Sequence, residues 1–491
     1  MTFTRTGKFR VFLWIGQAFL FCATDALSQS DSTILARIAD KVLSVREFKL
    51  RTELTIRPDN FKDKNAALDN LISEKILSLE AQQTSQLPAN PVFQATLKGI
   101  KEQAMRDKLQ EEVAAQNIRI DTAEMKTAYS LSQREYEVEF YTFRDRDLAG
   151  RITDALENAP ELSDEVFREL ESMAGKKPVR KVQFKDPDDE AIHDALFSSP
   201  LDTGSVVGPL KLGSGEYIVM RVVNWVDYPL VSGDEQLARW AEVKDFLRQS
   251  KARKLWVGYQ AELMKGKKIE FNRSTFTALS DIAFKYYVLR KERDSSHVET
   301  KSLPLLGQDL DLKAPFFTID GKTWSVGEFQ QELLSHPLVF RTTALDSMNF
   351  KREFKLAVVD MVRDHYLTLE SYERTLDASD EVSRTVEMWK DALLAQDEQK
   401  RIIESTLKDG KINADDREGV RQFWTSYLQN LQMKYSNRIV INQAVLAKIT
   451  LTNIDLFAYR QGVPYPVVVP EFPLFISTQK LDAMLRKLLN L

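Results

Sequence analysis

An eleven-residue pattern occurs twice in this chain, and any fold assigned to the chain has to accommodate both copies. Residues 38–48 (IADKVLSVREF) and 319–329 (IDGKTWSVGEF) are identical at six of eleven positions. Each copy is typical of a short strand, a tight turn and the start of a helix. In each copy a serine stands where an N-cap is expected and a glutamate three residues later completes a capping box: Ser44 with Glu47, and Ser325 with Glu328. The repeat predicts two related structural units.

A second pair of matching segments follows further along the chain. Residues 256–263 (WVGYQAEL) and 424–431 (WTSYLQNL) share Trp, Tyr and Leu at spacings that fall on one face of a helix. Residues 269–272 (IEFN) and 439–442 (IVIN) then predict a short strand in each copy. We therefore expect each copy to begin with a strand and a capped helix and to end with a long helix and a strand.

The two copies differ in what lies between their ends. In copy one, residues 136–143 (YEVEFYTF) and 217–223 (YIVMRVV) have the alternation and aromatic content of strands, and residues 148–173 have helical periodicity. In copy two the corresponding residues 350–408 are helical throughout. The fold class predicted is therefore mostly α, with an α+β domain inserted in copy one. The low glycine content, 18 of 491 residues, agrees with long helices.

The first 28 residues have the features of a secretory signal peptide. Three basic residues precede an apolar run at residues 11–23, and Ala26 and Ser28 are small residues on the amino side of a cleavage point. An uncleaved anchor is the alternative. Cleavage after Ser28 would remove Cys22, the one cysteine, unless that residue is lipidated. We expect a periplasmic or other extracytoplasmic protein with no transmembrane span after cleavage.

Several classes of chemistry have no sequence support. The four histidines are never three or four residues apart and there is a single cysteine, so we expect no metal site. No Walker loop or dinucleotide-binding glycine pattern occurs, so we expect no cofactor. The net charge is −4 and there is no basic block, so we expect no nucleic-acid partner.

The order of these segments resembles that of SurA/PrsA-type exported chaperones and parvulin-like peptidyl-prolyl isomerases, over roughly residues 34–280 and more weakly to about residue 447. Residues 68–77 (LDNLISEKIL) are similar to a helix of that family. Residues 192–198 (IHDALFS), followed by Gly208-Pro209, resemble the end of a parvulin domain. The resemblance implies two copies of a SurA N-terminal-like helical frame and a parvulin-like fold for the insert.

The chain departs from the parvulin pattern where catalysis would need it. Glu139 and Ile218 stand where the family has histidines, and residues 177–184 (KPVRKVQF) place an Arg or Lys where a glycine-rich loop of the family has an acid. Rotation about an X-Pro bond faces a barrier of about 18–20 kcal/mol, which an isomerase lowers with a polar network around the twisted amide. We therefore expect a degenerate parvulin-like domain that is catalytically inactive.

Two groups of site residues remain as candidates. If the domain is active, the residues expected to act are on adjacent strands that face one groove: Glu139, Tyr141 and Tyr217. An apolar floor that would hold a hydrophobic side chain of a bound peptide is expected from a helix of the insert: Ile192, Leu196 and Phe197.

Three functions follow from these features. The first is an ATP-independent chaperone or assembly factor that binds unfolded or nascent exported polypeptides or envelope clients. The second is an active peptidyl-prolyl isomerase. The third is a dedicated structural partner of an envelope complex, bound through residues 463–491, where a proline-rich extended segment precedes an apolar-faced helix. That helix is expected either to pack within the chain or to dock a partner or a membrane surface.

The predicted domain organisation has six parts. They are the signal peptide (1–28), a helical chaperone-like core (29–134 with 229–280), the degenerate parvulin-like domain (135–228), a linker (281–312), a second helical core without an insert (313–447), and the proline-rich segment with the C-terminal helix (448–491).

Overall fold

The structure is a computed structural model, and it describes most of the chain. The described residues are 14–15, 33–57, 61–159, 162–175, 177–186, 188–213, 215–289, 310–342, 344–413, 416–452 and 456–473. Apart from residues 14–15, the predicted signal peptide lies outside them, as do the predicted C-terminal helix and most of the predicted linker. The chain divides into unit 1 (Met1–Leu109, Lys267–Val339 and Asp360–Leu491) and unit 2 (Gln110–Gly266 and Phe340–Val359).

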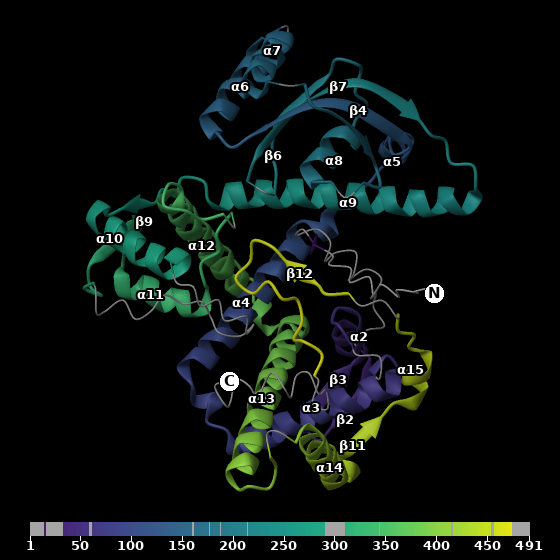
Figure 1. Cartoon of the computed structure of the whole chain (residues 1–491), viewed down its shortest axis with the longest axis vertical. Helices are drawn as coiled ribbons and strands as arrows, with labels where there is room; N and C mark the ends of the chain where they lie inside the picture. The colour runs from purple at the N-terminus through teal and green to yellow at the C-terminus, as the bar shows by residue number, and fades with distance from the viewer. Residues whose placement is uncertain are drawn as a thin grey trace, which may run out of the picture. The chain divides into compact units, whose positions relative to one another are not determined.

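Helices dominate the described chain, and its strands form small, mainly antiparallel sheets, so a mostly α chain with α+β regions is confirmed (Figure 1). Unit 1 contains β1 (Trp14–Ile15), β2 (Ile34–Ile38), β3 (Lys41–Ser44), α2 (Val45–Glu53), α3 (Lys64–Thr84), α4 (Pro91–Val113), β8 (Glu270–Phe271), α10 (Arg273–Phe284), β9 (Pro315–Ile319), β10 (Lys322–Ser325), α11 (Val326–Ser335), α13 (Asp380–Lys408), α14 (Arg417–Tyr435), β11 (Ile439–Ile441), α15 (Gln443–Lys448) and β12 (Tyr459–Arg460). The last turn of α4 is assigned to unit 2. Unit 2 contains α5 (Thr122–Leu131), β4 (Arg134–Phe143), α6 (Arg146–Asn158), α7 (Ser163–Ala174), β5 (Val179–Gln183), α8 (Glu190–Phe197), β6 (Val206–Lys211), β7 (Tyr217–Asp227) and α9 (Gly233–Leu263), while α12 (Phe350–Glu373) belongs to both.

The sequence repeat is also a repeat of backbone structure. Both copies form an antiparallel hairpin, β2–β3 and β9–β10, and both place the same turn position, Ala39 or Asp320, at a positive φ. In both, the serine that ends the second strand accepts a hydrogen bond from the N–H of the glutamate three residues later. The capping box is complete at Ser325. At Ser44 only half of the box forms, because the Glu47 carboxylate instead pairs with Lys75.

Each hairpin is completed by the closing strand of the other copy. Strand β11, from the end of copy two, pairs with β2 in copy one, and β8, from the end of copy one, pairs with β9 in copy two. The registers are equivalent, since Ile441 lies opposite Ala36 as Phe271 lies opposite Phe317. The asparagine after each closing strand, Asn442 or Asn272, caps the helix that follows. The predicted grouping of residues 29–134 with 229–280 therefore differs from the observed pairing, and α9 belongs to unit 2.

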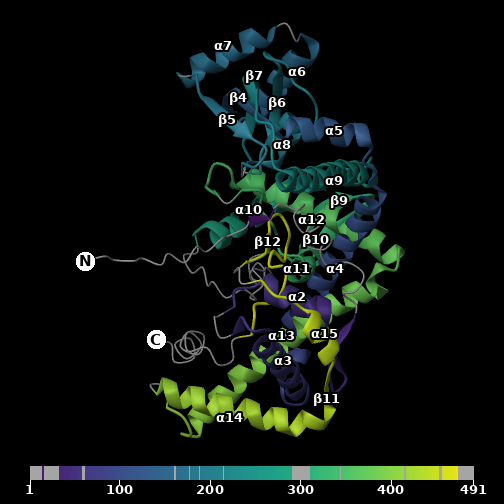
Figure 2. The ribbon, with the colours of Figure 1, turned by 90° about the vertical axis from the view of Figure 1, so that its right-hand side faces the viewer.

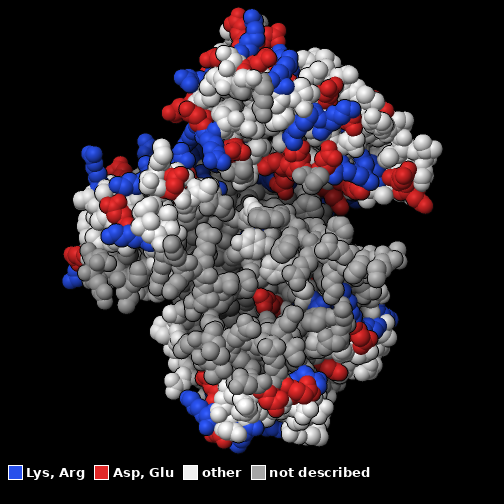
Figure 3. Space-filling model, viewed as in Figure 1, with Lys and Arg blue, Asp and Glu red and all other residues white. Residues whose placement is uncertain are grey.

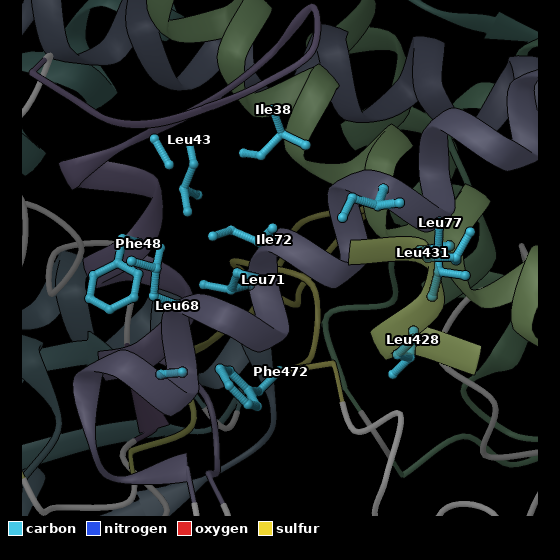
Figure 4. Close-up of a cluster of buried hydrophobic side chains, with 14 of the residues drawn as sticks. Ile38, Leu43, Phe48, Leu68, Leu71, Ile72, Leu77, Leu428, Leu431 and Phe472 are labelled. Atoms are coloured by element: carbon cyan, nitrogen blue, oxygen red, sulfur yellow. The ribbon is translucent and has the colours of Figure 1, made fainter. Parts of the chain in front are cut away.

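The core around the first hairpin is built from both ends of the chain. Apolar residues of β2, α2 and α3 pack with residues of α13, α14 and α15 and with Phe472. Figure 4 shows side chains from these segments converging, among them Ile38, Phe48, Leu71, Leu428 and Phe472. Helices α3 and α13 run beside one another, as Figures 1 and 2 show. Trp424, from the second repeated segment, is fully buried in this core.

A buried ion network crosses the same core. The Asp391 carboxylate on α13 lies 2.8 Å from Lys41 Nζ and 2.9 Å from Lys75 Nζ, and it accepts a 2.6 Å hydrogen bond from Ser78. Lys75 Nζ also lies 2.6 Å from the Glu47 carboxylate. All of these side chains are at most about one-tenth exposed, so the network fixes α13 against the first hairpin and α3.

Unit 2 is built on a four-stranded antiparallel sheet in the order β5-β4-β7-β6. Figure 1 shows α6 and α7 on one side of this sheet and α5, α8 and α9 on the other. The first side buries Tyr141 and Val219 against apolar residues of α6 and α7. The second side buries Val138, Ile218 and Met220 against α5, α8 and α9. The sheet therefore separates two small cores, and the candidate residues divide between them.

No helix among the described residues is both long and apolar enough to span a membrane.

Candidate functional site

The strand register of unit 2 brings the three candidate catalytic residues onto one face of the sheet. Glu139 and Tyr141 alternate along β4, and Tyr217 lies opposite Phe143, two residues further along the same face. Glu139 lies opposite Arg221 of β7, and Tyr141 lies opposite Val219. This face is the one covered by α6 and α7.

Glu139 is almost completely buried, at 1% exposure, and its carboxylate is fully engaged. The Tyr141 hydroxyl donates to Oε1 at 3.1 Å, and Arg221 donates to Oε2 from Nε at 3.1 Å and from Nη2 at 2.6 Å. Lys177 Nζ lies 3.4 Å from the same oxygen. A carboxylate that is engaged by two cations and a hydroxyl acts as a structural counter-ion within the sheet face.

The surroundings of Arg221 and Tyr141 complete this cluster. Arg221 also pairs with Asp164 of α7 at 2.5 Å, and its guanidinium lies over the Phe167 ring, 4.6 Å from the centroid. Burial and the hydrogen bond to Glu139 raise the pKa of Tyr141 to about 12, so its hydroxyl stays protonated at neutral pH. These contacts hold α7 against the face of the sheet that carries Glu139.

Tyr217 does not join Glu139 and Tyr141. Its ring stacks on Phe143, with centroids 6.0 Å apart, and no hydrogen bond connects it to the Glu139 cluster among the described residues. The structure thus brings together two of the three candidates and adds Arg221 and Asp164, which sequence analysis did not identify. Arg221 could be identified only from the strand register, because its contact with Glu139 depends on which residue of β7 lies opposite Glu139.

The predicted apolar floor lies on the opposite face of the sheet. Ile192, Leu196 and Phe197 are 2%, 0% and 0% exposed and belong to the core between the sheet, α5, α8 and α9. The ring of Phe197 packs edge-on against Tyr136 and Phe184. Side chains buried this completely offer no surface to a peptide, so the structure does not support these three residues as a peptide-binding floor. Their helical spacing is explained by core packing.

His193, on the same helix, is half-buried beside the rings of Phe184 and Phe197, and burial lowers its pKa below the usual 6.5. It is therefore a neutral packing residue that faces the core rather than the sheet face that carries Glu139.

Unit 2 exposes several large apolar side chains along the segment where β7 leads into α9. We call this surface the β7–α9 corner, and its members are Val226, Tyr228, Val231, Leu237 and Trp240, which are 46%, 53%, 91%, 73% and 38% exposed. The connection is ordered by hydrogen bonds from Tyr228 N–H to the Gln133 carbonyl at 2.8 Å and from the Gln236 amide to the Leu230 carbonyl at 2.8 Å. Trp240 packs on Tyr129, with ring centroids 5.4 Å apart.

Sequence analysis did not identify this corner. Residues 226–231 (VDYPLV) contain the only available signal, an apolar and aromatic run around a proline between a strand and a helix. Exposed apolar clusters on a folded unit are typical of surfaces that bind polypeptides or membranes. Because these hydrogen bonds hold the backbone of the corner, its exposed side chains are attached to an ordered backbone.

Charge on the described surface is mixed. On the face shown in Figure 3, Lys and Arg side chains alternate with Asp and Glu side chains over both units. Among the described residues, no three His, Cys, Asp or Glu side chains are grouped as a metal site would require.

Comparison with known protein families, with curated proteins and with solved structures finds no match to this chain.

Proposed function

We propose that this protein is an ATP-independent chaperone or assembly factor that holds unfolded polypeptides in an extracytoplasmic compartment. The observation that supports the proposal most directly is the β7–α9 corner, where five large apolar side chains are exposed on an ordered support. Contacts of this kind bind apolar-rich chains without nucleotide energy, and several weak sites on one chain would give avidity with rapid release.

The insert is proposed to be a parvulin-like domain without isomerase activity. The proposal is supported by β4 and β7, the first and last strands of the insert's sheet in chain order, which contain the residues that the resemblance compares with the first and last strands of a parvulin domain. The carboxylate at Glu139 already accepts from Tyr141, Arg221 and Lys177, and α7 is fastened over it. Stabilising a twisted X-Pro amide needs free, preorganised donors, which this arrangement does not present to a substrate.

Suppression of aggregation tests the chaperone proposal. A chemically unfolded, carboxymethylated protein should aggregate more slowly when the full chain is present. The double variant Val231→Ser/Leu237→Ser should need at least about threefold more protein for the same protection, because it removes the two most exposed apolar side chains of the corner. The matched control is Met173→Ser/Met348→Ser, which changes two exposed methionines elsewhere in unit 2 (66% and 94% exposed). Equal protection by both double variants would reject the corner as the binding surface.

Exchange NMR on a panel of X-Pro peptides tests the inactive-domain proposal. We expect the full chain to leave the cis–trans exchange rate at its uncatalysed value while the resonances of apolar peptides broaden on binding. Acceleration that disappears in Tyr217→Phe would instead support the isomerase function.

A further inference from the structure

A proline-rich loop of the chain packs against α4 and α11 of unit 1. Residues 456–473 include the short strand β12, and Tyr459 forms an antiparallel bridge with Val467. The Arg460 N–H donates to the Pro466 carbonyl at 2.7 Å, which closes a turn over residues 461–466 (QGVPYP). We call these six residues the Pro-Tyr-Pro loop. Its glycine, Gly462, adopts a φ of +74°, which favours glycine at this position.

The main chain of Tyr465 is bound by a side chain of α4. The side-chain amide of Gln103, on α4, donates to the Tyr465 carbonyl at 2.8 Å and accepts from the Tyr465 N–H at 2.9 Å. Gln103 is itself only 9% exposed. One side-chain amide thus satisfies both backbone polar groups of a single residue, a form of recognition that does not depend on which side chain that residue carries.

The ring of Tyr465 is held by two other elements. Its hydroxyl donates to the carbonyl of Ser335, the last residue of α11, at 2.9 Å. Beneath it lies Gly99 of α4, where a Cβ atom would collide with both the Tyr465 ring and the Ser335 carbonyl. The missing side chain at Gly99 therefore makes the space that the ring fills. We call Gly99, Gln103 and Ser335 the tyrosine seat.

The seat matches an aromatic residue between two prolines. Pro464 and Pro466 have no backbone N–H, so the single N–H of this tripeptide is that of Tyr465, and Gln103 accepts from it. Proline also restricts the flanking backbone before binding, which lowers the entropic cost of occupying the seat.

The same mode of recognition recurs where the segment is anchored. Arg51 donates to the Glu471 carbonyl at 2.9 Å, and Asn70 donates to the Pro473 carbonyl. Phe472 between them is buried against Phe61, with ring centroids 5.5 Å apart. Residues 469–473 are therefore fixed in the core, whereas residues 463–468 are only partly buried.

We propose that the tyrosine seat is a binding site for polypeptide segments with an aromatic residue between prolines, and that the Pro-Tyr-Pro loop occupies it in cis as a displaceable latch. A client segment of this type competes with the tethered loop for Gln103 and for the space over Gly99. This inference rests on the proposed function, because it assigns a client class and a second contact surface to a polypeptide-holding protein.

Hydrogen exchange on the unmodified full chain is the first test. The probe is a synthetic peptide with the sequence of residues 462–468 (GVPYPVV). An excess of it should speed exchange at the Tyr465 amide at least about threefold, since displacement of the loop breaks the hydrogen bond from this amide to Gln103. Unchanged exchange at the Tyr465 amide under a large excess of peptide would overturn the proposal.

Fluorescence anisotropy of the labelled peptide is the second test. Tyr465→Ser should bind it about tenfold more tightly than the unaltered chain, because the tethered competitor loses its ring and the seat opens. The matched control, Tyr459→Ser, removes an exposed tyrosine from the neighbouring strand and should bind like the unaltered chain. A peptide with serine in place of tyrosine should bind Tyr465→Ser at least about tenfold more weakly, since nothing fills the space over Gly99. Equal binding of the two peptides, or equal binding by the chain with and without Tyr465→Ser, would overturn the proposal.

The two proposals fail in different measurements. If the chain protects the carboxymethylated protein but the peptide leaves the loop in place, the latch is rejected and the chaperone function stands. If no protection is seen, the chaperone function is rejected, and the anisotropy of the peptide still decides the latch.

Discussion

The two hairpins of the repeat share a backbone but not an environment. Lys41 and Lys322 occupy the same position in their copies, yet Lys41 is 8% exposed and pairs with Asp391 at 2.8 Å. Lys322 is largely exposed, and its closest acid is Glu328 at 3.9 Å. Glu328 caps its own helix, whereas the equivalent Glu47 is turned toward Lys75. One pattern of residues therefore serves a buried network in one copy and a surface cap in the other.

The difference shows which features a repeat preserves. The turn, the N-cap and the strand register depend on residues within or directly beside the hairpin, and they are the same in both copies. The charged residues of the two hairpins have different partners, because α3 and α13 supply ion-pair partners beside the first hairpin. Burial by distant elements thus changes the role of a residue without changing the backbone around it.

The largest effect is expected from dividing the chain between residues 289 and 310. Each fragment then contains one hairpin and the closing strand that belongs to the other, so residues 33–109 have neither β11 nor α13 to pack against in the first fragment alone. We expect their amides to be protected from hydrogen exchange only when the two fragments are mixed, and the fragments to co-purify. Full protection of residues 33–109 in the isolated first fragment would show that the strand exchange is not needed for folding.

Asp391→Ala should have the next largest effect. It leaves Lys41 and Lys75 buried without their shared carboxylate, which we expect to lower the free energy of unfolding by about 3–5 kcal/mol. Burial opposes its ionisation, but Lys75 and Lys41 hold the pKa of Asp391 below its usual 3.8. Its stabilising effect is therefore present above about pH 4 and is lost as the pH falls further. Urea unfolding between pH 2 and 7 measures both, and an unchanged acid dependence in the variant would contradict this assignment.

Lys41→Met and Lys322→Met compare equivalent lysines directly. We expect Lys41→Met to cost about 2 kcal/mol, because it removes one partner of the buried Asp391. Lys322→Met should change the free energy of unfolding by less than about 0.5 kcal/mol, since exposed ion pairs contribute little. Urea unfolding of both variants at neutral pH gives the difference. Similar costs at the two positions would mean that the copies are energetically alike.

Substitutions of the two N-cap serines should change the free energy of unfolding by similar amounts, unlike substitutions of the two lysines. Ser44→Ala and Ser325→Ala each remove a hydroxyl that accepts the N–H of the third helical residue, at 3.0 Å and 3.2 Å respectively. Each should cost about 1 kcal/mol in urea unfolding. Ser44→Thr and Ser325→Thr, which keep the acceptor, are the matched controls. A cost confined to one copy would show that the shared geometry does not imply shared energetics.

The smallest expected effect is a pH dependence particular to copy two. The Ser325 N–H donates to the Glu328 carboxylate at 2.8 Å and lowers the pKa of Glu328 below its usual 4.5. This contribution is present above about pH 4.5 and fades as the pH falls. Glu328→Gln should flatten that part of the stability profile between pH 3 and 5. A profile identical to that of the unaltered chain would remove Glu328 from the capping box.

The candidate site was only partly predictable from sequence. Alternation along β4 placed Glu139 and Tyr141 on one face, and the structure confirms that they touch. Arg221 was not found, because cross-strand partners depend on register over more than 80 intervening residues. The apolar spacing of α8 was interpreted as the floor of a peptide site, but which surface a helix face meets is a tertiary property, and Ile192, Leu196 and Phe197 lie in the core of unit 2.

The sequence by itself determined the repeated hairpins, their turns and caps, and the mostly helical composition with an α+β region. These features follow from contacts between residues close together in the chain, where side-chain type limits the backbone directly. Only the tertiary structure decided that each hairpin takes its third strand from the other copy, that Lys41 is buried while Lys322 is not, and that the Pro-Tyr-Pro loop lies over Gly99. Backbone hydrogen bonds at a strand edge accept any strand of suitable length. The choice between two similar partners is therefore made by the cores that assemble around them.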